Sequence, residues 1–148
     1  MSIPRFAAYA AAFEKAYETD DWSEVGSFFT PDAVYDVPLD PPIGGRFEGR
    51  DAILAYFKRV LDGFDRRFET RELELLEGPE LRDGAVWIRW RGSYRVADAP
   101  PFVMEGEETA RFRGDAIERL EDRFESGAAG KLAAWMGANG AKLKPSPA

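Results

Sequence analysis

The sequence predicts a single α+β domain in which N-terminal helices pack against a cone-shaped, strongly curved sheet of mixed or antiparallel strands. Apolar residues recur at helical spacing in the first half of the chain and alternate with polar residues in the second half. Turn-forming pairs of residues separate the alternating segments. A length of 148 residues suits one domain, and no repeat or linker divides the chain.

Helices are predicted for most of the first half. Residues 4–18 place apolar side chains at steps of three and four, and residues 51–64 do the same. Between them, Asp21 and Glu24 form a capping-box pattern that would open a short helix, and Thr30-Pro31-Asp32 would end it. Residues 33–37 read as a short strand. The loop rich in Pro and Gly at 38–49 is either a lid or a plain connection.

Four strands are predicted in the second half, at residues 68–77, 85–96, 102–113 and 116–124. Turns at Gly78-Pro79, Asp83-Gly84, Pro100-Pro101 and Gly114-Asp115 would separate them. The step from Ile117 to Leu120 breaks the alternation and indicates a β-bulge. A last helix is expected at 126–139, followed by a loose tail at 142–148. A sheet bent in this way leaves a hollow beneath it, which is a usual place for a small ligand.

Composition excludes several classes of function. A net charge of −7 and an isoelectric point near 4.8 argue against nucleic-acid and membrane partners. The chain has no Cys and no His, which removes disulfides, Ser-His-Asp or Cys-His catalysis and imidazole metal sites. No metal ligand pattern or organic cofactor is indicated. The N-terminus lacks the pattern of a signal peptide, so a cytoplasmic location is expected.

Three segments, in their order and spacing, resemble the nuclear transport factor 2-like superfamily, and its SnoaL-like, or polyketide cyclase-like, members in particular. They are Asp21-Trp22 with Phe28-Phe29-Thr30-Pro31-Asp32-Ala33-Val34-Tyr35, then Phe47-Glu48-Gly49-Arg50-Asp51-Ala52-Ile53, and Phe112-Arg113-Gly114-Asp115-Ala116-Ile117-Glu118-Arg119-Leu120-Glu121-Asp122-Arg123-Phe124-Glu125. The resemblance covers about residues 4–125. It implies the fold and a small-molecule pocket, and it implies no one reaction, because this fold hosts enzymes and binding proteins alike.

The resemblance also allows catalytic positions to be compared. Ketosteroid isomerases use a Tyr and an Asp at positions that hold Phe13 and Val37 here, and Asp36 would point to the opposite face of its strand. Limonene epoxide hydrolase uses an Arg and two Asp residues. Asp122 and Arg89 match the second Asp and the Arg, whereas Arg91 replaces the other Asp.

Alternation within the strands leaves several alternatives open. Arg89, Arg91 and Arg95 share one face of a strand. They form either a cationic wall that binds a ligand or a ladder of ion pairs with Glu105, Glu107 and Glu121, and we favour the ladder. The opposite face, with Ile88, Trp90 and Tyr94, lines either the core and pocket or a dimer surface. Asp122 interrupts an apolar face and is either functional or a structural partner.

Three functions fit these patterns. The first is a protein that binds a small hydrophobic molecule without turnover, through Tyr35, Val37, Phe13, Trp90 and Phe57. The second is a lyase, cyclase or hydrolase that acts on such a molecule through Asp122 and Arg89. The third is an interaction module whose pocket is filled by its own Trp135 or Phe102. A homodimer is expected in each case.

Overall fold

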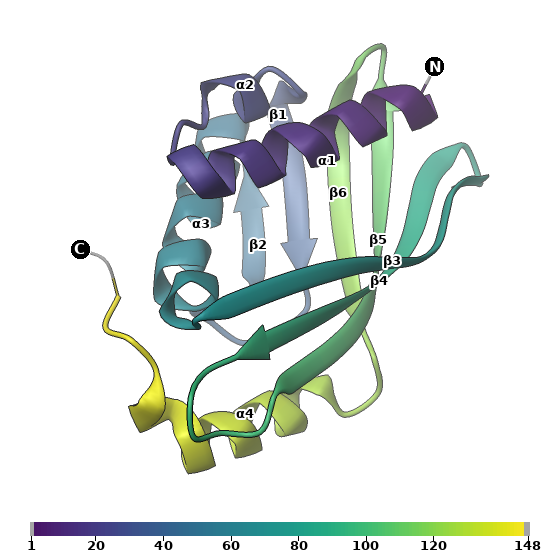
Figure 1. Ribbon diagram of the computed structural model, residues 1–148. Coiled ribbons are helices and arrows are strands. Elements are labelled where there is room, and N and C mark those ends of the chain that lie inside the picture. Colours follow the sequence, from purple (N-terminus) through teal and green to yellow (C-terminus); the bar gives the residue numbers. More distant parts are fainter. Residues whose placement is uncertain (1, 147–148) are drawn as a thin grey trace.

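A six-stranded mixed sheet forms the centre of the computed structural model, which describes residues 2–146 (Figure 1). The strand order is β2-β1-β6-β5-β4-β3, and only β1 and β6 run parallel to each other. The strands are β1 Phe29–Val37, β2 Gly45–Glu48, β3 Thr70–Arg82, β4 Ala85–Arg95, β5 Phe102–Arg113 and β6 Ala116–Phe124. The α+β class and the curved sheet expected from the sequence are confirmed.

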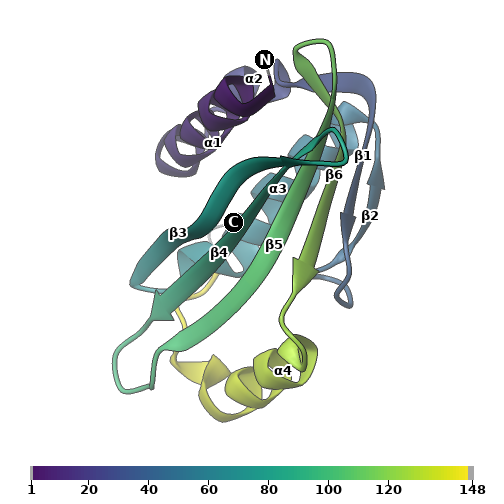
Figure 2. The same cartoon turned by 90° about the vertical axis from the view of Figure 1, so that its right-hand side faces the viewer.

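Helices cover one face and one end of the sheet. The α-helices are α1 Ser2–Thr19, α2 Ser23–Gly26, α3 Arg50–Gly63 and α4 Ala128–Asn139, and short 3-10 turns follow α3 at Asp65–Arg67 and α4 at Gly140–Lys142. Figure 2 shows α1 and α3 inside the curve of the sheet and α4 beneath its lower end. Within the described residues, no helix is long and apolar enough to cross a membrane.

Irregular pairing accompanies the curvature in several strand pairs, β5–β6 and β3–β4 among them. Arg111 of β5 faces Arg119 of β6 and Phe112 of β5 faces Ile117 of β6, so that Glu118 is the extra residue of a bulge in β6. Ile117 and Leu120 therefore both face the core, with no exposed surface, as the broken alternation predicts. Another irregularity lies in β3 at Gly78, whose φ is 88°. A Cβ atom there would lie 2.6 Å from the carbonyl oxygen of Trp87, which only glycine avoids.

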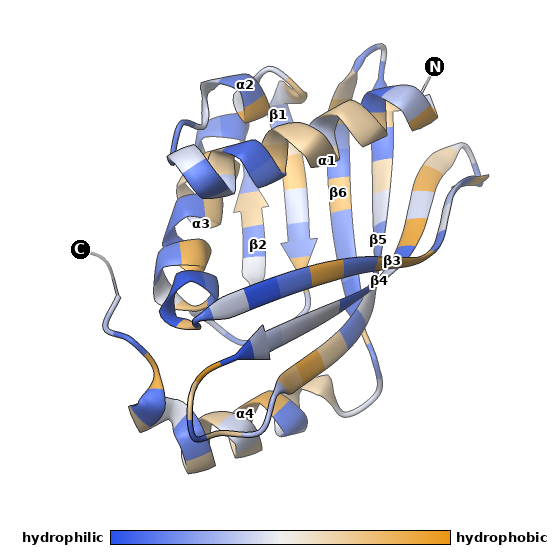
Figure 3. Cartoon of the chain, viewed as in Figure 1, coloured by the Kyte–Doolittle hydropathy of each residue, from blue (hydrophilic) through white to orange (hydrophobic). Residues whose placement is uncertain are grey.

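The apolar side chains form two clusters. The larger one lies between α1, α2, α3 and the upper sheet and includes Phe29, Ile53 and Leu120. The smaller one packs α4 against the ends of β4 and β5, with Phe102 and Trp135 in contact. In Figure 3 the middle of α1 is hydrophobic and its C-terminal end is hydrophilic, although Ala16 in the last turn is still buried in the larger cluster.

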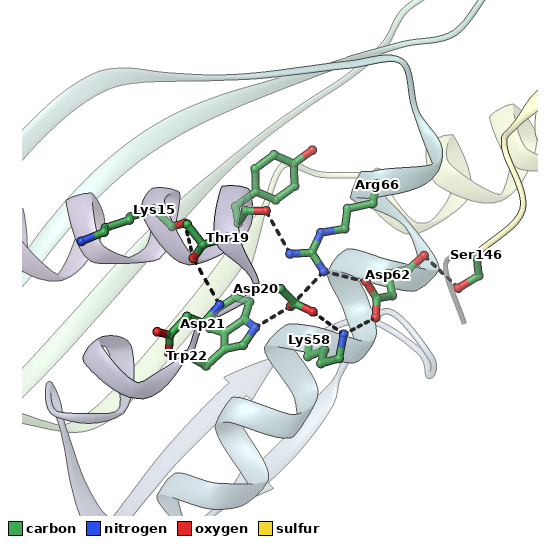
Figure 4. A network of polar contacts seen from close by, with 10 residues as sticks. Lys15, Thr19, Asp20, Asp21, Trp22, Lys58, Asp62, Arg66 and Ser146 are labelled. Carbon is green, nitrogen blue, oxygen red and sulfur yellow. Dashed lines mark hydrogen bonds and ion pairs between the residues drawn. The ribbon is translucent and has the colours of Figure 1, made fainter.

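A network of charged side chains holds the C-terminal end of α1 against α3 (Figure 4). Lys58 Nζ lies 2.8 Å from Asp20 and 2.9 Å from Asp62, and Arg66 lies 2.6 Å from Asp62. Arg66 also donates a hydrogen bond to the Tyr17 carbonyl oxygen. Hydrogen bonds from Lys58 and Trp22 lower the pKa of Asp20 to about 2. The network therefore connects the end of α1 to α3 and to the 3-10 turn that follows α3.

The strand boundaries differ from the expectation at three places. β2 lies inside the segment 38–49 expected to be a loop, β1 already begins at Phe29, and β3 continues through Gly78-Pro79 as far as Arg82. Pro31 is tolerated in β1 because the pairing with β6 is interrupted between Phe29 and Val34.

The chain near α2 and near the C-terminus also differs from the expectation. Asp21 accepts hydrogen bonds from the backbone and hydroxyl of Ser23, and no capping box with Glu24 forms among the described residues. The start of the tail is docked: Leu143 is 8% exposed, and the Ser146 hydroxyl donates to the Asp62 carbonyl oxygen. Residues 147–148 of the expected tail lie outside the described residues.

Candidate functional site

A cavity of about 600 Å³ lies between the concave face of the sheet and helices α1 and α3. Its wall is mostly apolar and rich in aromatic rings, among them Phe6, Tyr9, Phe13, Tyr35, Phe57 and Trp90. Leu73 and Leu75 of the edge strand β3 also border it and are 47% and 54% exposed, so they lie where the cavity opens. Ligand pockets for small molecules commonly have this size and character.

The residues expected from the sequence to contact a ligand all lie in this wall. Phe13 comes from α1, Tyr35 and Val37 from β1, Phe57 from α3 and Trp90 from β4. Contact with a ligand itself stays a prediction. Trp135 and Phe102, which the third alternative placed inside the pocket, belong instead to the small core cluster at the lower end of the sheet.

Two carboxyl groups face each other across neighbouring strands in the cavity wall. Glu108 of β5 is directly opposite Asp122 of β6, and on its other side it pairs with Ile88 of β4. Tyr35 is opposite Leu120, two residues before Asp122, so its side chain projects from the same face. The alternation of side chains along β1, β5 and β6 thus brings Tyr35, Glu108 and Asp122 together.

Asp122 is buried and only partly satisfied by hydrogen bonds. The residue is 9% exposed, and its Oδ2 accepts a hydrogen bond from the hydroxyl of Tyr35. Its Oδ1 receives no N–H or O–H donor from residues 2–146. A buried carboxylate oxygen without a donor is costly, so a proton carried by the neighbouring Glu108 is the natural partner for it.

The two carboxyl groups shift each other's ionisation. Burial, together with the charge of Asp122 and the hydrogen bond between the two groups, raises the pKa of Glu108 well above its usual value. Burial also raises the pKa of Asp122, although hydrogen bonds from Glu108 and Tyr35 oppose the shift. No Lys or Arg contributes to either shift within the described chain. Two carboxylates this close do not both ionise readily, so the pair, named the carboxyl pair below, retains a proton above the usual carboxyl range.

Tyr9 of α1 adds a hydroxyl group to the same cavity. Its side chain is 4% exposed and borders the cavity. Burial, followed by the charges of Glu108 and Asp122, raises its pKa well above the usual value. The hydroxyl group therefore stays protonated and is available to a bound molecule. The sequence placed Tyr9 in the core, because its spacing is that of a buried helix face.

The charged residues of the cavity wall are acidic, apart from one arginine. Asp65 and Glu14 bind Arg71, with Nε 2.8 Å from Asp65 and Nη1 2.9 Å from Glu14. Arg71 is the one basic residue among the described lining residues, and both of these contacts neutralise it. The side chains of Arg71 and Asp65 are 5% and 11% exposed, so this ion pair is largely buried.

Arg89 does not meet Asp122. Ile88 and Trp90 face the cavity, so Arg89 between them projects from the convex face, 3.6 Å from Glu77 and 3.5 Å from Glu105. The expected pairing of Asp122 with Arg89 is therefore wrong.

The favoured ladder of ion pairs is present only in part on that convex face, because Arg89 and Arg91 both pair with Glu105, whereas Glu107 accepts a hydrogen bond from Trp87. Arg91 lies 3.0 Å from Glu105, and Arg119 binds Glu121. Asp36 also lies there, with Arg46 at 3.2 Å, on the opposite side of the sheet from the cavity as the alternation along its strand predicts. In the described part of the chain, no three acidic side chains gather in the way a metal site requires.

Comparisons with known proteins agree with this geometry. The SnoaL-like domain family matches residues 9–122. A putative isomerase from Rhodopseudomonas palustris is 13% identical with a TM-score of 0.70, covering 88% of this chain and 96% of its own. A nuclear transport factor 2-like protein from Anabaena variabilis is 17% identical with a TM-score of 0.67, covering 86% and 92%.

A third solved structure carries a bound molecule. It is a hypothetical protein with a ketosteroid isomerase-like fold from Catenulispora acidiphila, in complex with trimethylamine, 22% identical with a TM-score of 0.59, covering 87% of this chain and 92% of its own. None of the curated proteins compared with this chain matches it significantly. At these identities the solved structures establish the fold alone.

Proposed function

Because this chain belongs to the SnoaL-like domain family, we propose that it binds one small, largely apolar molecule in the cavity between α1 and the sheet. The family supports a ligand-binding domain. The observation that carries the proposal is the combination of a cavity of about 600 Å³ with a few inward polar groups, Tyr9, Glu108 and Asp122. Such groups orient a ligand while the apolar wall supplies affinity.

Neighbouring alanines on α1 provide a matched test of this proposal. Ala10 borders the cavity and is exposed, whereas Ala11 is exposed and lies outside the described wall. Ala10→Trp would place an indole ring in the entrance, and Ala11→Trp adds the same ring to the solvent side of the same helix. Neither change disturbs a buried side chain.

Binding is measured by calorimetric titration with phenylbutanol and with phenylbutylamine, two probes small enough for the cavity. At least one probe is expected to bind wild type and Ala11→Trp equally, and to bind Ala10→Trp at least tenfold more weakly, about 1.4 kcal/mol. Native mass spectrometry would show any molecule that copurifies with wild type and is lost from Ala10→Trp. Equal binding by all three proteins would contradict the proposal.

The carboxyl pair favours a second candidate function, which is catalysis by proton transfer. A pair that shares one proton can donate it from Glu108 and accept one at Asp122, as general acid and base in a lyase, cyclase or hydrolase reaction. Once a reaction is identified, Asp122→Asn is expected to lower kcat by at least a hundredfold, whereas Arg89→Met is expected to leave kcat unchanged. An unchanged rate in Asp122→Asn would exclude this role.

The homodimer and the cytoplasmic location expected from the sequence stay predictions. Light scattering coupled to size-exclusion chromatography tests the first, with a mass of twice 16.6 kDa expected.

A further inference from the structure

We propose that the molecule bound in this cavity is a cation, a small lipophilic amine whose ammonium group lies against Glu108 and Asp122. This inference rests on the proposed binding function and adds the charge of the ligand to it. Three observations support it: the uncompensated acidity of the wall, the hydrogen-bonding groups at the carboxyl pair that are open to a bound donor, and the aromatic faces around them.

The charge of the wall is unbalanced. Five carboxyl groups border the cavity, those of Glu14, Asp65, Glu74, Glu108 and Asp122, and one guanidinium group faces them; Glu74 pairs with Arg91, which lies outside the wall, at 3.5 Å. The guanidinium group in the wall already binds Glu14 and Asp65. Glu108 and Asp122 are left without a positive partner among residues 2–146. An anionic ligand would therefore be repelled, and a cation would supply the missing positive charge.

Hydrogen-bonding groups at the carboxyl pair are open to a bound donor. Asp122 is 9% exposed, and apart from the proton that it can share with Glu108 its Oδ1 accepts no N–H or O–H donor from the described chain. Tyr9 is 4% exposed, and its hydroxyl oxygen can accept as well as donate. A primary ammonium carries three donors and no acceptor, so its hydrogen-bonding pattern complements carboxylate and hydroxyl oxygens.

Aromatic rings surround the same place. Tyr35 binds Asp122 directly, and Trp90 and Phe124 form an edge-to-face pair on the adjoining strands. Gly106 lies opposite Trp90, where a Cβ atom would come within 2.7 Å of the indole ring, so the glycine allows this ring to lie across β5. Faces of aromatic rings attract ammonium groups, most strongly in sites shielded from water.

Binding of an amine by this pair would depend on pH. A nearby cation favours the ionised carboxylates, so the bound amine would displace the proton that the pair retains. The groups that face the pair are the hydroxyls of Tyr9 on α1, Tyr35 on β1 and Tyr56 on α3, and each has a raised pKa because of burial. These hydroxyls stay neutral near neutral pH. Protons released when the amine binds would therefore come from Glu108 or Asp122. Affinity for the amine is expected to rise with pH through the raised pKa of the pair.

The test uses three probes that have phenylalkyl chains of similar length and differ in charge. Phenylbutylamine, phenylbutanol and phenylbutyrate are titrated into the full-length protein at pH 7 by calorimetry, in two buffers of different ionisation enthalpy. The amine is expected to bind at least tenfold more tightly than the alcohol, the carboxylate is expected to bind most weakly, and the amine is expected to release protons.

Substitutions then test whether the preference for the amine over the alcohol depends on the carboxyl pair. Glu108→Gln and Asp122→Asn keep the shape of the wall and are expected to reduce the preference for amine over alcohol to less than threefold. Glu107→Gln, the same change on the convex face of the same strand, is expected to keep it. Circular dichroism confirms that each variant is folded.

The outcomes separate the two proposals. Equal binding of amine and alcohol by wild type would refute the charge inference and leave the binding function standing. Tighter binding of phenylbutyrate than of the amine would do the same. Absence of binding by all three probes would refute both.

Discussion

Replacing Glu108 by Gln should change how the stability of the protein depends on pH. In the folded wild type, the carboxyl pair retains one proton above the usual carboxyl range, because burial raises the pKa of both groups and the charge of Asp122 raises that of Glu108 further. In the unfolded chain, both groups are ionised above about pH 5. Folding therefore takes up about one proton, and Glu108→Gln removes one of the two groups that can hold it, so the uptake is expected to be smaller in this variant.

The sign and size of the effect follow from that proton. Because the unfolded chain binds fewer protons, the free energy of unfolding falls as pH rises, by about 1.4 kcal/mol for each pH unit and proton. The stability linked to the pair is complete below the unfolded pKa and is lost progressively as pH rises towards the raised folded pKa. Between pH 5 and pH 7 the wild type is thus expected to lose up to about 2.7 kcal/mol relative to Glu108→Gln.

Other ionisable groups do not obscure the comparison. The pKa of Asp20 is lowered to about 2, so its stabilising effect is complete above pH 5 and is lost only at more acid pH. Burial raises the pKa of Asp65, but Asp65 is present in both proteins and its contribution cancels in the difference.

Urea unfolding followed by circular dichroism at pH 5, 6 and 7 measures the effect, with Glu107→Gln as control. The control is expected to follow the wild type, because Glu107 lies on the convex face and accepts a hydrogen bond from Trp87 that Gln can also accept. Parallel profiles for wild type and Glu108→Gln, within about 0.5 kcal/mol over the two pH units, would show that the pair does not retain a proton.

Three further substitutions can be tested by urea unfolding at pH 7. Tyr35→Phe removes the hydrogen-bond donor to Asp122, so the free energy of unfolding is expected to fall by about 1–3 kcal/mol and the pKa of Asp122 to rise. Unaltered stability would mean that this hydrogen bond contributes nothing to it. Arg71→Met leaves the buried Asp65 without its partner and is expected to cost about 3–5 kcal/mol. Arg89→Met breaks pairs on the exposed convex face and should cost at most about 1 kcal/mol. Equal losses of stability in Arg71→Met and Arg89→Met would show that the buried ion pair contributes no more than the exposed ones.

Long periodic segments were predictable from the sequence, and short or irregular ones were not. Helix α3 and strands β5 and β6 repeat their pattern over enough residues to identify both type and extent. β2 has four residues, too few for alternation to be recognised among the prolines and glycines around it. The early start of β1 was obscured by Pro31, which signals a break in most contexts and here occupies an unpaired part of the strand.

The candidate site was predictable in part. Asp122 was singled out because a carboxylate between Leu120 and Phe124 breaks an apolar face. Glu108 breaks the face of Met104 and Ala110 in the same way, but neighbouring acids on β5 obscured it, and its position opposite Asp122 depends on strand register. Pairing in register is set by contacts between segments distant in sequence, so no local pattern reveals it. Tyr9 carried no signal that distinguishes a core tyrosine from one at a cavity.

The division of the cavity wall between central and edge strands has a consequence for how the cavity can be altered. Glu108 and Asp122 belong to β5 and β6, which have neighbours on both sides, whereas Leu73 and Leu75 belong to β3, which has one. Half-exposed residues on an outer strand can be exchanged at little cost to folding. Replacements at Leu73 and Leu75 are therefore expected to reshape the entrance of the cavity, and with it the choice of the proposed ligand, while Glu108 and Asp122 stay in place.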